Sequence, residues 1–326
     1  MPRVLLLHTG GTLGMRGTSL EPDTYAAALT ETVPELLQIA ELDIEIVCNL
    51  DSSDVGSQHW TSLANSIAAA RTEYDGFVVV HGTDTMAYTA GALSFALHNL
   101  DRPVVLTGAQ RPLVAHRTDA RRNLVDAVEL ATRQIPEVGI CFDGLFMRGC
   151  RTTKSNAHDY RAFESPGCEP LARLGVDIDI SAHIRHPTAP FQCFSSFEPA
   201  VVVVHITPGL RPEMLEAMLH SYPNLKGVVF SAFGAGTVPS GAASIAPLIH
   251  SLVESGIEAL VATQSAGRIN LGLYQNSRQL VEAGAISAGR MRIEAAVTKL
   301  MHALATYPDS SQRRKYLESN IAGELD

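Results

Sequence analysis

The segment Val4-Leu5-Leu6-Leu7-His8-Thr9-Gly10-Gly11-Thr12 joins a short apolar run to a turn that is rich in glycine and hydroxyl groups. An uninterrupted aliphatic run bounded by turn residues is typical of a strand buried on both faces, which is common in parallel sheets. The glycines supply the backbone freedom that a tight turn after the strand requires. The segment therefore predicts a first buried strand with hydroxyl groups at its carboxyl end.

The same alternation of apolar runs and helical patterns continues along the chain. Runs that predict further buried strands lie at residues 44–47, 77–80, 104–107 and 139–142, and stretches with helical spacing lie at 61–70, 85–97 and 118–131. Strands that alternate with helices are typical of βαβ units. We therefore predict an α/β fold whose larger N-terminal domain contains a doubly wound, mostly parallel sheet.

A polar, proline-bearing stretch at residues 186–199 separates this pattern from a second one, in which strand-like runs and helical stretches resume. A chain of 326 residues also has about the length of two domains. We predict an N-terminal α/β catalytic domain at residues 1–185, a linker at residues 186–199, and a smaller C-terminal α/β domain at residues 200–326.

The charge and cysteine content exclude several classes of protein. Lys and Arg number 25 against 34 Asp and Glu, which gives a net charge of -9, and the basic residues are scattered. Binding to nucleic acid requires a concentrated positive field, so we expect no nucleic-acid partner. The five cysteines are odd in number and lack CxxC spacing, which argues against a disulfide framework or a zinc knuckle.

The apolar runs are too short for targeting or membrane insertion. The aliphatic run at Val4–Leu7 is shorter than the core of a signal peptide, and no later run approaches the ~20 residues of a membrane span. We therefore expect a protein of the cytoplasm with no membrane association.

Small polar side chains follow four of the predicted strands, at residues 9–14, 49–54, 81–86 and 107–112. In an open α/β sheet the ligand crevice lies at the carboxyl ends of the strands. Helix capping and turn formation are alternative explanations for these residues. A dinucleotide loop is disfavoured, because the spacing is GGxxG instead of GxGxxG. We interpret His81 as a packed or turn-bonding residue in preference to a general base.

Two of these segments resemble the signature segments of bacterial-type asparaginases: Thr9-Gly10-Gly11-Thr12-Leu13-Gly14 and the stretch from Gly76 to Met86. Further similarity lies at residues 151–154 and 295–300, and the match extends over essentially the whole chain. Residues 51–54 and 86–90 are most similar to the cytoplasmic type I branch. The resemblance implies an amidohydrolase that converts L-asparagine to L-aspartate and ammonia.

The resemblance also implies a role for particular residues. It identifies Thr12 as the attacking hydroxyl, Tyr25 as its neighbour on a lid, and Thr83, Asp84 and Lys154 as a second catalytic cluster. These roles are chemically consistent, because an alcohol attacks well only after a base removes its proton. A lysine can be that base once it is neutral, and an ionised carboxylate nearby opposes the loss of its proton.

Substrate binding is assigned in the same way. The resemblance implies that Ser52 and Asp84 bind the α-carboxylate and the α-ammonium group of the substrate, and Asp51 and Ser53 are candidates beside them. The candidate site consists of hydroxyls, one carboxylate and one amine, without a cluster of histidines or cysteines at ligand spacing. We therefore expect that no metal ion and no organic cofactor is required.

Three departures from the family pattern affect particular roles. Leu13 replaces an isoleucine or valine, and Thr237 stands where relatives place an asparagine that enters the site of a neighbouring subunit. Residues 263–267 correspond to a cysteine-containing segment of the regulatory site in some type I relatives. The resemblance further implies a homodimer or a homotetramer, and the preference between asparagine and glutamine stays open.

Two other functions are alternatives. One is the ammonia-generating subunit of a tRNA-dependent amidotransferase, for which we expect an N-terminal extension, whereas the first strand here begins at Val4. The other is a non-catalytic amino-acid sensor on the same fold. The presence of Thr12, Tyr25, Thr83 and the remaining two candidate catalytic residues disfavours the sensor.

Overall fold

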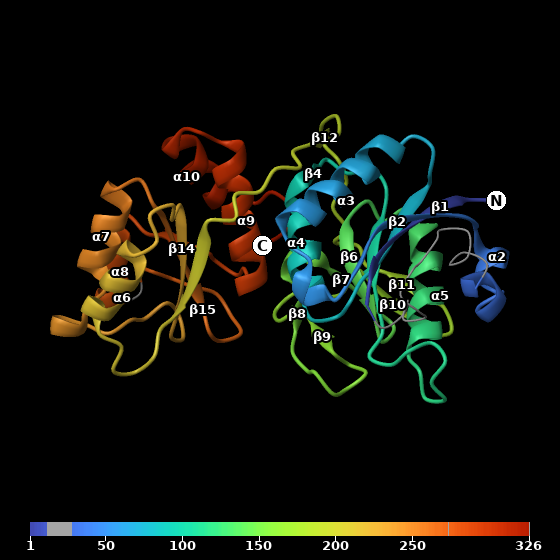
Figure 1. Ribbon diagram of the computed structural model, residues 1–326, viewed down its shortest axis with the longest axis horizontal. Helices are drawn as coiled ribbons and strands as arrows, with labels where there is room; N and C mark the ends of the chain where they lie inside the picture. Colours follow the sequence, from blue (N-terminus) through green and yellow to red (C-terminus); the bar gives the residue numbers. More distant parts are fainter. Residues whose placement is uncertain (12–27, 273, 326) are drawn as a thin grey trace. The chain divides into compact units, whose positions relative to one another are not determined.

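The computed structural model describes residues 1–11, 28–272 and 274–325, and these residues form two compact units, Met1–Ser195 and Ser196–Asp326. The expected α/β class is confirmed in both: unit 1 contains a large, mostly parallel sheet and unit 2 a smaller parallel sheet (Figure 1). The predicted boundaries at residues 185/186 and 199/200 stay predictions.

Unit 1 is built on one eight-stranded sheet in the order β11-β10-β7-β6-β5-β3-β1-β2. Strands β2, β1, β3, β5 and β6 are parallel, and β7, β10 and β11 continue the sheet in antiparallel pairs. In chain order the strands are β1 (Arg3–Gly10), β2 (Glu41–Leu50), β3 (Gly76–Val80), β5 (Val104–Thr107), β6 (Val138–Phe142), β7 (Leu145–Arg148), β10 (Ala172–Leu174) and β11 (Ile178–Ile180).

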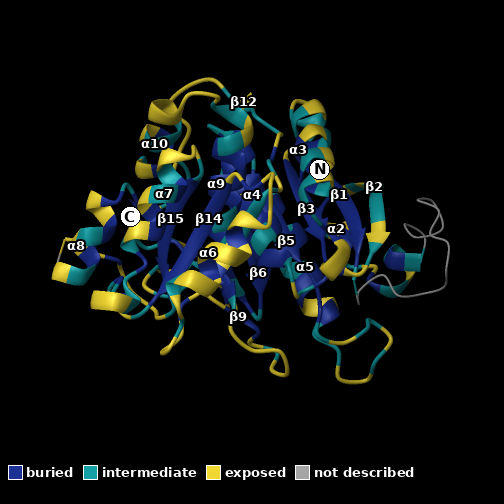
Figure 2. Ribbon diagram, turned by 60° about the vertical axis from the view of Figure 1, so that its left-hand side comes forward, coloured by how far each residue is buried: buried dark blue, intermediate teal, exposed yellow. Residues whose placement is uncertain are grey.

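Helices cover both faces of this sheet, as expected for a doubly wound fold (Figure 1). Alternate strand residues such as Leu6 and Val78 pack with the helices of one face, where they form one hydrophobic core. That face carries α2 (Leu36–Ile39) and α5 (Ala120–Ala131), and the other carries α3 (Ser57–Ala70) and α4 (Met86–Ala96). Figure 2 shows the buried strands between the helices.

Short elements complete unit 1. Two short helices, η2 and η3, follow β2 and β7, and two small antiparallel pairs join β4 to β12 and β8 to β9. Their bounds are η2 (Ser52–Asp54), β4 (Leu97–His98), η3 (Gly149–Arg151), β8 (Thr153–Lys154), β9 (Phe163–Glu164) and β12 (Gln192–Cys193). Lys154 is the last residue of β8, and the path of the chain through η3 and β8 brings it close to Thr83, which follows β3.

Unit 2 contains a four-stranded parallel sheet in the order β13-β14-β15-β16. Helices α6, α7 and α8 contribute to the core on one face, and α9 packs on β13, β14 and β15 (Figure 1). The elements are β13 (Val201–His205), α6 (Pro212–His220), β14 (Gly227–Ala232), η4 (Gly241–Ala243), α7 (Ala246–Glu254), β15 (Glu258–Thr263), α8 (Gln275–Glu282), β16 (Ile286–Ser287), α9 (Ile293–Thr306) and α10 (Ser310–Glu318).

A buried ion pair fixes the C-terminal segment of unit 2. Lys299 Nζ on α9 lies 2.5 Å from Glu324 Oε1, and both side chains are fully buried. The same nitrogen donates to the carbonyl oxygens of Leu317 and Ser319 at 3.0 and 2.6 Å. A buried charge pair is tolerated when hydrogen bonds satisfy both groups, as they do here.

Among the described residues, no helix has the length and apolar character needed to cross a lipid bilayer.

Candidate active site

The carboxyl ends of β1, β2 and β3 lie in close contact, and glycines make this possible. Gly10 and Gly11 have φ angles of 119° and 83°, and the N–H of Gly11 donates to the carbonyl oxygen of Leu50 at 3.3 Å. A Cβ atom on Gly11 would lie 2.6 Å from Gly82 Cα, and one on Gly82 would lie 2.7 Å from Ser52 Cβ. Only glycine permits this approach, so the predicted meeting of strand ends occurs.

The residues after β2 form the short helix η2, and they divide into two kinds. Asp51 accepts hydrogen bonds from the backbone N–H and the hydroxyl of Ser53 at 2.9 and 2.7 Å, and these bonds lower the pKa of the Asp51 carboxyl. Asp51 and Ser53 therefore cap the turn, which was one of the interpretations open from the sequence. Ser52 is buried, and its carbonyl accepts from Thr85 Oγ1 at 2.5 Å.

Lys154 meets two adjacent residues that follow β3, although it lies about 70 residues further along the chain. Lys154 Nζ lies 2.8 Å from Thr83 Oγ1 and 2.6 Å from Asp84 Oδ1. The Lys154 side chain is 15% exposed and the Asp84 side chain is 70% exposed. The amine is therefore enclosed, whereas the carboxylate keeps a side open to a second cationic partner.

Gln110, after β5, belongs to the same cluster, and it was not among the site residues predicted from the sequence. Its Oε1 atom accepts from Thr83 Oγ1 at 3.3 Å, and its Nε2 atom donates to the carbonyl oxygens of Ala157 and Asp159. Its place in the polar stretch after a predicted strand was the only sequence signal, because a neutral amide has no ionisable chemistry. The cluster thus draws on the ends of β3 and β5 and on the segment after η3.

His81 closes β3 and is a packed residue, in agreement with our interpretation. Its Nδ1 atom lies 2.7 Å from the carbonyl oxygen of Gly82, which can only accept, so Nδ1 carries the hydrogen. Its Nε2 atom then accepts from the Thr89 hydroxyl at 2.9 Å, and Trp60 Nε1 donates to the same hydroxyl oxygen at 3.0 Å. Burial lowers the pKa of His81 to about 4. The neutral ring therefore supports the turn that presents Thr83.

Two of the predicted catalytic residues, Thr12 and Tyr25, lie outside the described residues. In unit 2, the Thr237 hydroxyl donates to the carbonyl oxygen of Phe233 at 3.3 Å, within its own turn. Thr263 Oγ1 donates to the carbonyl oxygen of Gly234 at 2.5 Å. Both hydroxyls thus hold turns at the carboxyl end of the unit 2 sheet.

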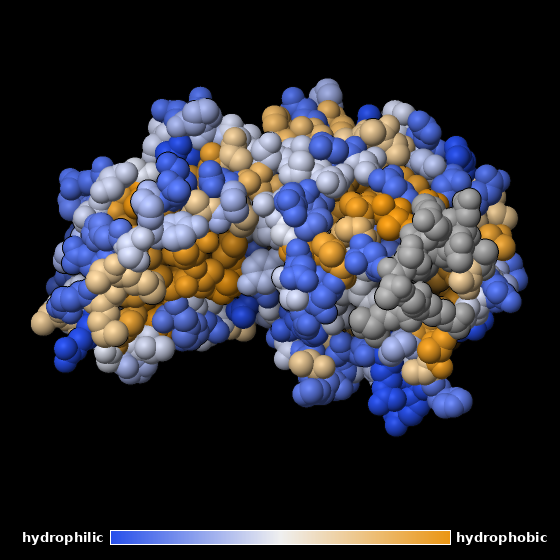
Figure 3. All heavy atoms as spheres, in the orientation of Figure 1, coloured by the Kyte–Doolittle hydropathy of each residue, from blue (hydrophilic) through white to orange (hydrophobic). Residues whose placement is uncertain are grey.

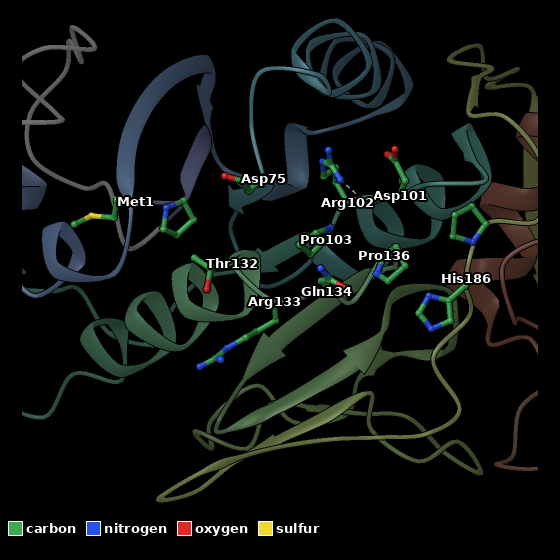
Figure 4. A pocket seen from close by; sticks show the side chains of 12 residues that line it. Met1, Asp75, Asp101, Arg102, Pro103, Thr132, Arg133, Gln134, Pro136 and His186 are labelled. Atoms are coloured by element: carbon green, nitrogen blue, oxygen red, sulfur yellow. Dashed lines mark hydrogen bonds between the residues drawn. The ribbon is translucent and has the colours of Figure 1, made fainter.

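Open cavities lie at both ends of the strands of the unit 1 sheet. One of about 610 Å³ is lined by residues before β3, β5 and β6, including Asp75, Arg102 and Pro136 (Figure 4). It faces the amino ends of the strands, opposite to where open α/β sheets bind ligands. Another cavity of about 610 Å³ is lined by Gln110, Arg111 and the segment 156–160. It lies beside the lysine cluster, which is the name used below for Lys154, Thr83, Asp84 and Gln110. Within the described ranges, no three His, Cys, Asp or Glu side chains are grouped to hold a metal ion.

The fold and this candidate site define a class: a two-unit α/β protein in which a hydroxyl, an amine and a carboxylate lie together near the strand ends of the larger unit. Residues 3–186 match the family model for the asparaginase N-terminal domain, and residues 200–317 match that for the glutaminase/asparaginase C-terminal domain. The chain therefore belongs to the asparaginase family and is an amidohydrolase.

Individual relatives support this assignment along the whole chain. L-asparaginase 1 of Escherichia coli (strain K12) is 34% identical, with 99% of this chain and 97% of the relative covered. A glutamyl-tRNA(Gln) amidotransferase subunit of Pyrococcus abyssi (strain GE5 / Orsay) is 33% identical, with 100% of this chain and 77% of the relative covered. The solved thermostable L-asparaginase from Thermococcus kodakarensis matches with a TM-score of 0.90 at 32% identity, with 99% of each chain covered.

Proposed function

We propose that this chain hydrolyses the side-chain amide of L-asparagine to L-aspartate and ammonia, with Thr12 as the nucleophile. The observation that supports it most is the contact of Lys154 Nζ with both Thr83 Oγ1 and Asp84 Oδ1, at 2.8 and 2.6 Å. A lysine that contacts a hydroxyl and a carboxylate at once is placed to exchange a proton with either. This arrangement suits acyl transfer without a metal ion.

Substrate recognition in this proposal uses the open side of the cluster. The Asp84 carboxylate binds the α-ammonium group, because most of its side chain is accessible beyond the contact with Lys154. Ser52, which packs against Gly82 one residue before Thr83, binds the α-carboxylate. Asp51 and Ser53 take part indirectly, because their hydrogen bonds fix the turn that carries Ser52.

The chemistry proceeds in two halves. Attack by the Thr12 hydroxyl oxygen on the amide carbon forms a C–O bond, and the C–N bond breaks when the leaving nitrogen receives a proton and departs as ammonia. Water then attacks the resulting ester, the proton it loses returns to the Thr12 oxygen, and L-aspartate is released. Thr83, Asp84 and Lys154 relay these protons, and Tyr25 polarises the attacking hydroxyl.

One assay tests the substrate assignment. The purified chain, with no other protein added, is supplied with L-asparagine, L-glutamine or D-asparagine, and ammonia release is measured. We expect release from L-asparagine that a chelator does not reduce and that Thr12→Ala abolishes. Absence of ammonia from every free amino acid would contradict the proposal.

The second candidate function is that of an amidotransferase component, because a relative with that name is 33% identical over the full length of this chain. The same assay separates the two functions. A chain that releases ammonia only after a partner protein and aminoacyl-tRNA are added acts as such a component. Turnover of free L-asparagine by the chain alone favours the asparaginase.

We also propose that the chain forms a homodimer or a homotetramer. Strand β13 is an edge strand of unit 2, and hydrophobic side chains gather at its position (Figure 3). Val203 on β13, together with Met214 and Met218 on α6, is exposed. Edge strands and apolar areas of this kind are commonly covered by another chain. Light scattering that gives a monomeric mass at micromolar concentration would contradict this proposal.

A further inference from the structure

The side chain of Gln110 connects the lysine cluster to a neighbouring loop. Its Nε2 atom donates to the carbonyl oxygens of Ala157 and Asp159 at 3.1 and 3.0 Å, and its Oε1 atom accepts from Thr83 Oγ1 at 3.3 Å. The amide is half-buried. One side chain thus contacts the proposed relay and the segment that follows Lys154.

The orientation of this amide follows from the chemistry of its partners. Backbone carbonyl oxygens only accept hydrogen bonds, so the atom of Gln110 that faces Ala157 and Asp159 must be the NH₂ group. The amide oxygen then faces Thr83, and an amide oxygen cannot donate. The hydroxyl hydrogen of Thr83 is therefore directed at Gln110.

The direction of the next hydrogen bond follows. The single hydrogen of the Thr83 hydroxyl is already used, so the 2.8 Å contact requires Lys154 Nζ to donate and Thr83 Oγ1 to accept. Hydrogen bonds that run in one direction, here from Lys154 to Thr83 to Gln110, polarise one another and so stabilise the positive charge of the first donor. Lys154 can take the proton of Thr83 only after the hydroxyl turns away from Gln110.

We propose that Gln110 is a positioning residue for the Thr83 hydroxyl, which it holds in the orientation that keeps Lys154 as the proton donor. The inference rests on the proposed function, because it matters for turnover only if Thr83 and Lys154 relay protons. The Asp84 carboxylate contacts Lys154 at 2.6 Å, and its negative charge favours the same state.

The backbone of Gln110 is fixed independently of its side chain. The N–H groups of Gln110 and Arg111 both donate to the Asp119 carboxylate, with distances of 2.9 and 3.0 Å. Asn123 Nδ2 donates to the same carboxylate at 3.1 Å. Replacing the Gln110 side chain by one of similar volume therefore leaves its backbone anchored, so the role of the amide can be tested alone.

Three variants separate positioning from loop support. Gln110→Met removes both the acceptor for Thr83 and the donors to the loop. Gln110→Glu keeps an acceptor oxygen and adds negative charge. Asn156→Ala weakens the loop alone, because Asn156 Oδ1 accepts from the N–H groups of His158 and Asp159. A residue that only supports the loop would make the first and third variants alike.

The readout is the reactivity of the Lys154 amine in the protein without substrate. Cyanate carbamylates only neutral amines, so the labelling of Lys154 at a fixed pH of about 8, relative to the exposed Lys226, reports how readily the amine loses its proton. We expect the labelling of Lys154 to be about threefold to tenfold faster in Gln110→Met, because the hydrogen bond from Thr83 to Gln110, which supports the charged state of Lys154, is lost. Gln110→Glu should label more slowly, and Asn156→Ala should stay within about twofold of the wild type.

Equal labelling of wild type and Gln110→Met, or the same increase in Asn156→Ala, would overturn the inference. The measurement needs no turnover, so failure of the proposed function is seen separately, as an absence of ammonia release. Where the chain is active, the rise of kcat with pH should move to lower pH in Gln110→Met and to higher pH in Gln110→Glu, whereas KM changes little.

Discussion

Each unit contains a close lysine–carboxylate pair, and the two pairs differ in their surroundings. Lys299 and Glu324 in unit 2 are both 0% exposed, whereas Lys154 and Asp84 in unit 1 are 15% and 70% exposed. Lys299 also donates to two carbonyl oxygens, and Glu324 accepts from two backbone N–H groups. A fully bonded, dry pair has no position for another partner.

The unit 1 pair has the opposite character. Lys154 donates to the Thr83 hydroxyl, with which we propose that it exchanges a proton during turnover, and Asp84 faces solvent on one side. A pair of this kind can change partners when a ligand cation arrives. The two pairs contain the same types of group, so burial and saturation of hydrogen bonds, not the residue types, separate the structural pair from the pair that we propose is chemically active.

The sharpest way to break the comparison is to remove each lysine. Lys154→Met should lower kcat by about 10²–10⁴-fold, the range for loss of a positioned proton-transfer group. The free energy of unfolding of Lys154→Met should differ from that of the wild type by less than about 1 kcal/mol, because the Asp84 carboxylate stays solvated when the lysine is removed. Lys226→Met, at an exposed lysine, is the control for loss of charge. Ammonia release and urea denaturation give the two quantities, and normal turnover in Lys154→Met would exclude it from the relay.

Lys299→Met should do the reverse. Removing one partner of a buried pair leaves Glu324 charged and buried without its cation, and unit 2 should lose about 3–5 kcal/mol of stability. The double variant Lys299→Met/Glu324→Gln should recover part of this loss, because the stranded charge is gone. Activity per folded molecule should stay close to that of the wild type. Stability unchanged in Lys299→Met, by urea denaturation, would show that the pair contributes nothing.

Asp84→Asn sharpens the comparison at the open carboxylate. The variant should weaken binding of asparagine by about 10–100-fold, the cost of losing a charged hydrogen-bond partner. An analogue of asparagine that lacks the α-amino group should bind to wild type and variant almost equally. Inhibition and KM measurements decide between the two. A loss of equal size for both ligands would mean that Asp84 acts in the chemistry or the folding, not in recognition of the ammonium group.

The smallest expected effect concerns the histidine beneath the cluster. Burial lowers the pKa of His81 from 6.5 to about 4, so between these values the unfolded chain binds a proton that the folded chain does not. The contribution of His81 is therefore complete above pH 6.5 and is lost as the pH falls to 4, by about 3 kcal/mol. His81→Gln should flatten the decline of stability between pH 6.5 and 4, and His186→Gln, at an exposed histidine, should not. Urea denaturation across this range tests it, and parallel curves for wild type and His81→Gln would contradict it.

The sequence predicted the buried parallel strands well, for a physical reason. The apolar runs 77–80, 104–107 and 139–142 fall on β3, β5 and β6, because both faces of these strands are covered by helices. Strand β2 extends from Glu41 to Leu50, beyond the predicted run, because it lies at the sheet edge and is only half-buried. The short antiparallel strands β10 and β11 carry exposed residues and so lack an apolar run to reveal them.

The site also contains one part that could be predicted from the sequence and one that could not. The polar ends of β1, β2, β3 and β5 could be predicted to meet, because parallel strands bring their carboxyl ends to one edge. The approach of Lys154 to Thr83 could not, because 71 residues separate them and no periodic pattern encodes the path through η3. Its place came from the family resemblance. Gln110 was missed because its role depends on three hydrogen-bond partners that lie far from it in the sequence. These partners are Thr83, Ala157 and Asp159.

The central claim is that Thr12 attacks the amide while the Thr83, Asp84 and Lys154 cluster handles protons. The most direct test is to quench the enzyme with acid during turnover of L-asparagine and to locate the aspartyl ester by peptide mass spectrometry. We predict the ester on Thr12 in the wild type and on no residue in Thr12→Ala. An ester on Thr83, with Thr12 unmodified, would contradict the account.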